Sequence, residues 1–80
     1  MKLPRDLAGE ALVRCLCRHW GYRQVHQVGS HVILETEDPS HQRIAVPVHQ
    51  SLRVGTLSGI LRSIADHKGV GRQEILETLG

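Results

Sequence analysis

A histidine directly follows a Gly-Ser pair in the stretch VGSHVIL, at Gly29, Ser30 and His31. Imidazole changes its charge between about pH 5 and 8, so a histidine can act as a general acid or a general base at neutral pH. Glycine allows close approach of the backbone to a ligand, and the Ser30 hydroxyl and N–H can donate hydrogen bonds to a phosphate oxygen. This combination suits RNA cleavage, because RNA carries its own nucleophile, the 2′-hydroxyl, and the protein need only move protons and stabilise the phosphorane.

Two other uses of these residues fit the sequence less well. The stretch holds no acidic residue to complete a serine-hydrolase triad, and Ser30 and His31, as neighbours on a strand, point to opposite faces. The six histidines lie at positions 19, 26, 31, 41, 49 and 67, without an i, i+4 pair on a helix or a Cys/His cluster of zinc spacing. We therefore expect neither a nucleophilic serine nor a metal site.

Complete acid–base cleavage also needs a second proton carrier or a cation near His31. His26 precedes the Gly-Ser turn and His49 ends the third predicted strand, so either histidine could carry the second proton. Two arginines lie nearby in the same predicted sheet. The residues expected to bind substrate are Gly29, Ser30, Arg23, Arg43 and His49.

The chain has 80 residues, of which 40% are hydrophobic and 22% charged, with a formal net charge of +2. These values predict one small globular domain over residues 1–80, with a mildly basic surface that can attract phosphate. One Trp, one Tyr and no Phe argue against nucleic-acid binding by aromatic stacking.

Targeting signals and cysteines indicate the compartment. The start MKLPRDLAGE lacks the apolar stretch of a signal peptide, and no apolar run reaches the ~18 residues of a membrane span. The two cysteines, Cys15 and Cys17, are two apart on a predicted helix and point to nearly opposite sides, so they cannot bridge each other. We expect a cytoplasmic protein with reduced thiols and no association with a membrane.

Runs of apolar residues at helical spacing flank three β-branched stretches. Helices are predicted over residues 8–19, 57–68 (with Thr56 as N-cap) and 72–80, and strands over residues 22–27, 31–37 and 43–49. The order α-β-β-β-α predicts an α+β fold: a three-stranded antiparallel sheet with the helices on one face, plus a short C-terminal helix. The other sheet face stays open, an arrangement similar to double-stranded-RNA-binding domains.

Alternation along the middle strand decides which face His31 occupies. Val32 and Leu34 point one way, while His31, Ile33 and Glu35 point the other way. If Val32 and Leu34 join the helices in the core, His31 lies on the open face.

The third predicted strand contributes to the same face. If the strands pair without a bulge, Arg43, Ala45 and His49 share a face opposite to Ile44. Pro47 has no backbone donor, so this strand must end or lie at a sheet edge there.

Five short sequence motifs occur in order along nearly the whole chain. They are KLPRDLAGEAL at the start, Gly21-Tyr22, Gly29-Ser30-His31, IAVPVH over residues 44–49, and Gly55-Thr56-Leu57 leading into ILRSIA. In this order and spacing they resemble the HicA family, the small ribonuclease toxins of bacterial toxin–antitoxin pairs. The chain departs from its relatives at Ala8, where they usually have a Ser or Thr cap, and at Val28, where a basic residue often precedes the motif.

The resemblance implies a double-stranded-RNA-binding-like fold that cleaves mRNA without a metal or other cofactor. It gives His31, the histidine of the Gly-Ser-His motif, the role of general acid or base. It also implies a HicB-type antitoxin that holds the protein inactive, with either a hetero-oligomer or a homodimer as the assembly. Val28 in place of a basic residue is expected to weaken phosphate binding beside the site.

Two non-catalytic functions remain as alternatives. The first is an RNA-binding module that uses Arg53, Arg62 and Lys68 on duplex backbones, although the chain lacks the clustered basic run typical of such modules. The second is a degenerate toxin that only binds its antitoxin, for which the partly apolar open face would serve as the contact surface.

Overall fold

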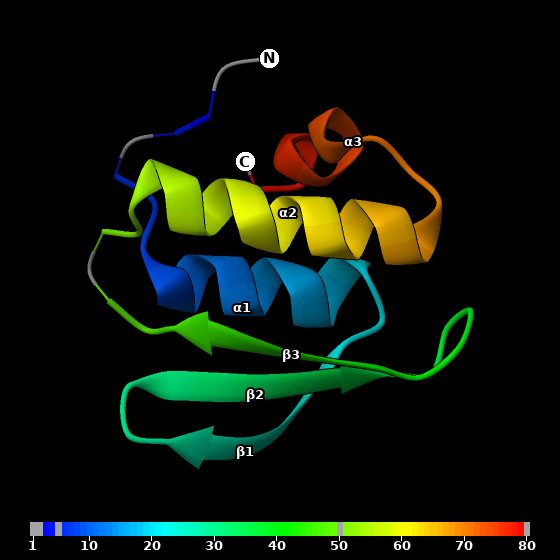
Figure 1. Cartoon of the computed structure of the whole chain (residues 1–80), viewed down its shortest axis with the longest axis horizontal. Coiled ribbons are helices and arrows are strands. Elements are labelled where there is room, and N and C mark those ends of the chain that lie inside the picture. The colour runs from blue at the N-terminus through cyan, green and yellow to red at the C-terminus, as the bar shows by residue number, and fades with distance from the viewer. Residues whose placement is uncertain (1–2, 5, 50, 80) are drawn as a thin grey trace.

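The computed structural model, which describes residues 3–4, 6–49 and 51–79, consists of a three-stranded sheet and three helices. The helices are α1 (Gly9–His19), α2 (Val54–Lys68) and α3 (Arg72–Glu77), and the strands are β1 (Arg23–Val28), β2 (His31–Thr36) and β3 (Gln42–Pro47). The strands form one antiparallel sheet in the order β1-β2-β3. The helices α1 and α2 lie together on one side of this sheet, and α3 packs against α2 (Figure 1). The predicted α+β fold is confirmed.

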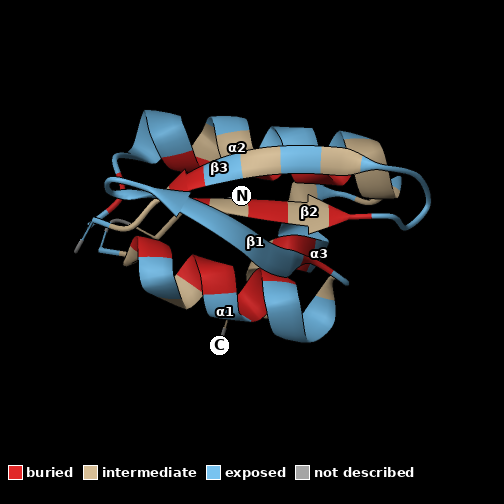
Figure 2. Ribbon diagram, turned by 90° about the horizontal axis from the view of Figure 1, so that it is seen from below, coloured by how far each residue is buried: buried red, intermediate tan, exposed pale blue. Residues whose placement is uncertain are grey.

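Leucines of the two long helices form the centre of the core. Leu12 and Leu16 of α1 and Leu57 and Leu61 of α2 are fully buried, in one cluster with Leu34 of β2. The other buried apolar members of the cluster are Val13, Tyr22, Val32, Val46, Leu52, Ile64, Ala65 and Ile75. Figure 2, viewed from the sheet side, shows these buried positions in red along the inner surfaces of the helices, while β1 is exposed along its whole length.

The second helix begins earlier than the sequence predicts. Thr56 is not the N-cap, because α2 starts at Val54 and the preceding Arg53 has the extended backbone of a cap residue. The first helical hydrogen bond runs from the Leu57 N–H to the Arg53 carbonyl at 2.9 Å, so residues 54–56 are already wound into the first turn. The end of the helix is as predicted, with Gly69 in the left-handed conformation.

The third strand ends earlier than predicted, at Pro47, so His49 lies in the following segment and not in the sheet. Pro47 offers no N–H, and the N-terminus of α1 lies directly against it. A Cβ atom on Gly9 would lie 1.8 Å from the Pro47 carbonyl oxygen. The chain then leaves the sheet, and the Gly9 N–H donates a hydrogen bond to the His49 carbonyl at 3.0 Å. The prediction that Pro47 marks a strand end at a sheet edge is confirmed.

Three smaller predictions can be compared with the structure. Cys15 is buried and Cys17 is exposed, and both thiols are free. The third helix ends at Glu77, short of the predicted residue 80, and Gly80 itself lies outside the described residues. None of the helices in the described ranges is long and apolar enough to cross a membrane.

Candidate active site on the open sheet face

The sheet face opposite the helices is uncovered. Val32, Leu34 and Thr36 of β2 are buried toward the helices, while His31 on the same strand is exposed. Strand register then identifies the residues that share the open face with His31: Arg23, His26 and Val28 of β1, Ile33 and Glu35 of β2, and Arg43, Ala45 and Pro47 of β3. The prediction that His31 lies on the uncovered face is confirmed.

A two-residue turn at Gly29-Ser30 places His31 at the start of β2. Val28 and His31 are the last paired residues before the turn. Gly29 has a φ of 58°, whereas Ser30 has no positive φ, which matches a type II′ hairpin turn with glycine at its first position. A Cβ atom at Gly29 would meet nothing within 4 Å, so the turn is open to solvent on that side.

Hydrogen bonds to two carbonyl oxygens hold the backbone of the turn. Gln27 Nε2 donates to the Gly29 carbonyl at 3.2 Å. The Val48 N–H donates a hydrogen bond of 2.7 Å to the Ser30 carbonyl. Within the described residues, the His31 ring has no hydrogen-bond or ion-pair partner. Among the residues that the structure describes, no carboxylate contacts this imidazole to orient it. An exposed, unpartnered imidazole can meet a substrate directly.

The two predicted substrate-binding arginines lie on the open face but gather around a carboxylate. Arg23 Nη2 is 3.7 Å from Glu35 Oε1, and Arg43 Nε is 3.9 Å from Glu35 Oε2. Glu35 lies four residues beyond His31 along β2, which corresponds to about 13 Å at the usual rise of a strand. The structure therefore brings Arg23 and Arg43 to each other and not to His31.

The remaining predicted site residue, His49, lies at the His31 end of the molecule. It is exposed and follows Pro47, which pairs with His31 across β2 and β3. Its backbone carbonyl is occupied by the Gly9 N–H. The prediction that His49 shares a strand face with Arg43 and Ala45 is wrong, because β3 ends before it is reached.

Regular pairing across the two-residue turn places His26 opposite Ile33 on the open face, and a β-bulge on the other side of His26 adds Arg23 to the same face. The register shifts between Gln24 and His26, so both Arg23 and His26 face away from the helices although they are three residues apart. His26 pairs with Ile33, and the side chains of His26 and His31 are both exposed. The sequence analysis predicts His26 as a candidate proton carrier, and the pairing of Val28 with His31 across the two-residue turn places it on the same face as His31.

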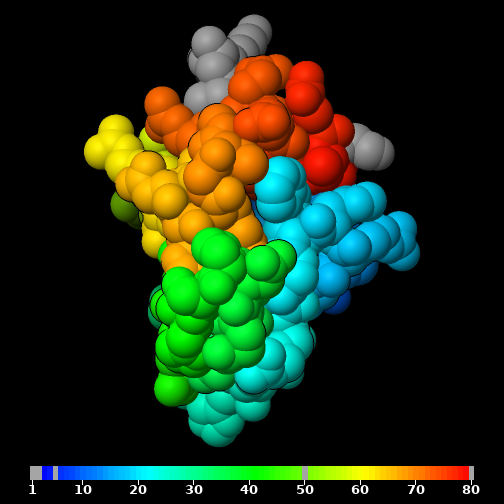
Figure 3. Space-filling view, turned by 90° about the vertical axis from the view of Figure 1, so that its right-hand side faces the viewer, coloured from blue at the N-terminus to red at the C-terminus, as the bar shows by residue number. Residues whose placement is uncertain are grey.

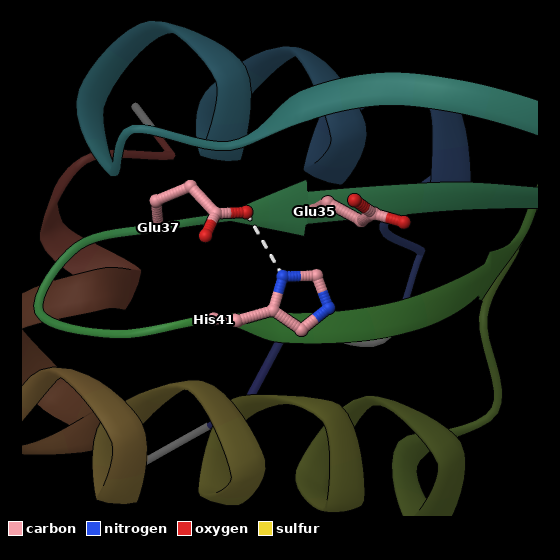
Figure 4. A group of neighbouring side chains, drawn as sticks. All are labelled: Glu35, Glu37 and His41. Atoms are coloured by element: carbon pink, nitrogen blue, oxygen red, sulfur yellow. Dashed lines mark hydrogen bonds and ion pairs between the residues drawn. The ribbon is translucent and has the colours of Figure 1, made fainter.

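At the far end of the sheet, Glu35, Glu37 and His41 form a cluster whose potential ligand atoms all lie within 4.8 Å of one another (Figure 4). Sequence spacing gave no sign of this group. His41 Nδ1 donates a 2.9 Å hydrogen bond to Glu37 Oε2, and Arg23 lies 3.7 Å from the same oxygen. The hydrogen bond from His41, with the charges of His41 and Arg23, lowers the pKa of the Glu37 carboxyl. These ion pairs and the hydrogen bond thus explain why the three side chains lie close together.

The Lys68 side chain of α2 packs against the same end of the sheet. Lys68 Nζ donates a 3.1 Å hydrogen bond to Thr36 Oγ1 and a second one to the Asp38 carbonyl, and it lies 4.8 Å from the centre of the Tyr22 ring. Burial lowers the pKa of Lys68 and raises the pKa of Tyr22 to about 12. Figure 3 shows the turn after β2, in green, packed against the end of α2, in orange.

These features define a class of protein: a small α-β-β-β-α-α domain whose fold is like that of double-stranded-RNA-binding domains, with an exposed histidine on its open sheet face. A family model for the HicA toxin of bacterial toxin–antitoxin systems matches residues 9–65, a range that includes α1, the whole sheet and His31. The chain belongs to the HicA toxin family. None of the curated proteins and none of the solved structures compared with the chain matches it. As a member of this family it is a toxin that has an antitoxin as its partner.

Proposed function

We propose that this toxin is a metal-independent endoribonuclease that cleaves mRNA, with His31 as a general acid or base, and that a HicB-type antitoxin neutralises it. The observation that carries the proposal is the His31 imidazole, exposed on the open face with no intramolecular partner among the described residues. Membership of the HicA toxin family supports the toxin role.

RNA cleavage by the 2′-hydroxyl requires few catalytic groups from the protein. The 2′-hydroxyl of the RNA attacks the neighbouring phosphorus, so the protein has to move protons and stabilise negative charge. A positioned imidazole contributes about 10²–10⁴-fold to such a reaction. The backbone at Gly29 and the exposed Ser30 hydroxyl lie beside His31 and can donate hydrogen bonds to a phosphate oxygen. Arg23 and Arg43, about 13 Å away along the face, would then bind the RNA backbone at a distance from the scissile bond.

The test is RNA cleavage by the purified toxin in excess EDTA, with His31→Gln compared with His19→Gln. His19 is an exposed histidine at the end of α1, away from the open face, so it serves as the matched control. We expect the first variant to lose cleavage by about 10²-fold or more and the second to keep the wild-type rate. Undiminished cleavage by His31→Gln, or cleavage that EDTA abolishes, would contradict the proposal.

A protein that only binds its antitoxin is the second candidate, because the open face carries apolar residues. Ile33 and Pro47 are half-buried, Ala45 is exposed, and Val28 is 57% exposed. Such a protein would bind the antitoxin, leave RNA intact and cause no growth arrest when induced alone. Growth arrest by the wild type but not by His31→Gln would exclude it.

A further inference from the structure

We propose that His26 is the second proton carrier of the cleavage reaction, acting with His31 as a pair of imidazoles across the β1–β2 hairpin. The inference rests on the proposed ribonuclease function and assigns the partner that His31 needs.

The register places the two histidines diagonally opposite each other. His26 pairs with Ile33, which lies two residues beyond His31 on the same face of β2. Diagonal neighbours of this kind have Cα atoms about 7–8 Å apart in an antiparallel pair. Both side chains are exposed, so each imidazole can reach a ligand that lies over the hairpin.

The bulge lies on the other side of His26 from the turn, so it does not disturb this placement. In a regular strand, residues three apart point to opposite faces, so without the bulge Arg23 would face the helices while His26 stayed on the open face. The extra residue, Val25, lets both side chains occupy the open face. Bulges are over-represented next to active sites, where they redirect a side chain.

The other charged groups of the face are engaged elsewhere or unsuited to proton transfer. Arg23 and Arg43 are paired with Glu35, and arginine does not release its proton in proteins. Glu35 itself lies between these two arginines, at the far end of the face from His31. His49 lies outside the strands, in a segment held through its backbone carbonyl. Among the described residues of the three strands, His26 and His31 are the two histidines, and both lie on this face.

The reaction balances with two imidazoles in opposite protonation states. The neutral imidazole takes the proton of the 2′-hydroxyl as the bond from O2′ to phosphorus forms. The imidazolium donates its proton to the 5′-oxygen as the bond from phosphorus to O5′ breaks. The products are a 2′,3′-cyclic phosphate and a 5′-hydroxyl, and the two histidines have exchanged protonation states.

The test is the pH dependence of cleavage by wild type, His26→Gln and the control His19→Gln. Two histidines in opposite protonation states give a bell-shaped dependence of kcat on pH. We expect His26→Gln to lose about 10²-fold or more in kcat and to lose one limb of the bell, while His19→Gln keeps both limbs and the wild-type rate. The limb that disappears assigns His26 as the acid or the base.

The outcomes separate this inference from the proposed function. A wild-type protein that does not cleave RNA refutes both. A protein that cleaves RNA and depends on His31, but whose His26→Gln variant keeps the wild-type rate and both limbs, refutes the role of His26 alone. His26 is exposed, so His26→Gln is expected to leave the unfolding midpoint unchanged, and a fall in rate with no change in stability identifies a chemical role.

Discussion

At the turn between β1 and β2 the contacts that reach it from other segments come from the backbone, and the one local side-chain hydrogen bond runs from Gln27 Nε2 to the Gly29 carbonyl at 3.2 Å. At the turn between β2 and β3 the contacts come from side chains. The first turn is held by the Val48 N–H on the Ser30 carbonyl, and the following segment by the Gly9 N–H on the His49 carbonyl. At the second turn, Thr36 Oγ1 accepts hydrogen bonds from the Asp38 N–H at 3.2 Å and from Lys68 Nζ at 3.1 Å.

This difference between the two turns decides which side chains are free to take part in a reaction. Side chains around the second turn are committed to structure: His67 Nε2 donates to the Ser40 carbonyl at 2.8 Å, and His41 donates to Glu37. Around the first turn, His26 and His31 remain exposed because peptide groups already secure the chain. A toxin this small can therefore present an unpartnered histidine on a fixed backbone.

The largest effect is expected from breaking the backbone contact behind the first turn. In Gly9→Ala the new Cβ would lie 1.8 Å from the Pro47 oxygen and 2.9 Å from its carbonyl carbon, so α1 or β3 must move. We expect the free energy of unfolding in urea to fall by about 3 kcal/mol or more. Gly59→Ala, in open space within α2, is the control and should be neutral or stabilising by up to about 1 kcal/mol. Equal stability of the two variants would contradict the close approach of α1 to β3.

A smaller effect is expected from ionising Tyr22 at the end held by side chains. The phenol is buried, its hydroxyl donates to Gln42 Oε1, and its pKa is raised to about 12 from 10.0. A raised folded-state pKa contributes stability that is complete below pH 10 and is lost as the pH rises through 12. Two pKa units correspond to about 2–3 kcal/mol.

The measurement is urea unfolding from pH 9 to about 12, compared between wild type and Tyr22→Phe. Lys68, whose pKa is lowered by burial and which lies against the Tyr22 ring, acts in the opposite direction, because its folded form releases its proton first. The difference between the two proteins therefore isolates the tyrosine. Parallel pH profiles would show that the phenol does not stay protonated in the folded state.

The smallest expected effect compares the two turns directly. Thr36→Val removes the hydroxyl that accepts from Asp38 and Lys68, and should destabilise the protein by about 1–2 kcal/mol in urea unfolding. Ser30→Ala, at the exposed first turn, should change stability by less than about 0.5 kcal/mol. The order should reverse for RNA cleavage, with Ser30→Ala the more impaired variant. A stability loss in Ser30→Ala as large as that in Thr36→Val would show that the Ser30 hydroxyl also holds the first turn.

Much of the architecture could be predicted from local patterns. The spacing of Leu12 and Leu16, and of Leu57 and Leu61, predicted two helical stripes, and these residues form the core. The ends of the helices and strands were less predictable. The start of α2 depends on the backbone conformation of Arg53, and the end of β3 depends on the close approach of Gly9 to Pro47. Neither feature can be recognised from the neighbouring residues in the sequence.

The candidate site likewise has one part that the sequence predicts and another part that it does not. Alternation of Val32 and Leu34 placed His31 on the open face, as the structure confirms. The arginines predicted near it instead surround Glu35, since cross-strand register, and not distance along the chain, decides which side chains meet.

By itself the sequence determined the order of the elements, the stripe that each helix buries, and the face on which His31 lies. These properties follow from the 3.6-residue and two-residue periods of the backbone, which are local. Only the tertiary structure decided the bulge that turns Arg23 to the open face, the pairing of Arg23 with Glu35, and the contact between Gly9 and Pro47. Each of these depends on hydrogen bonds and packing between segments that are separate along the chain, and no local period encodes them.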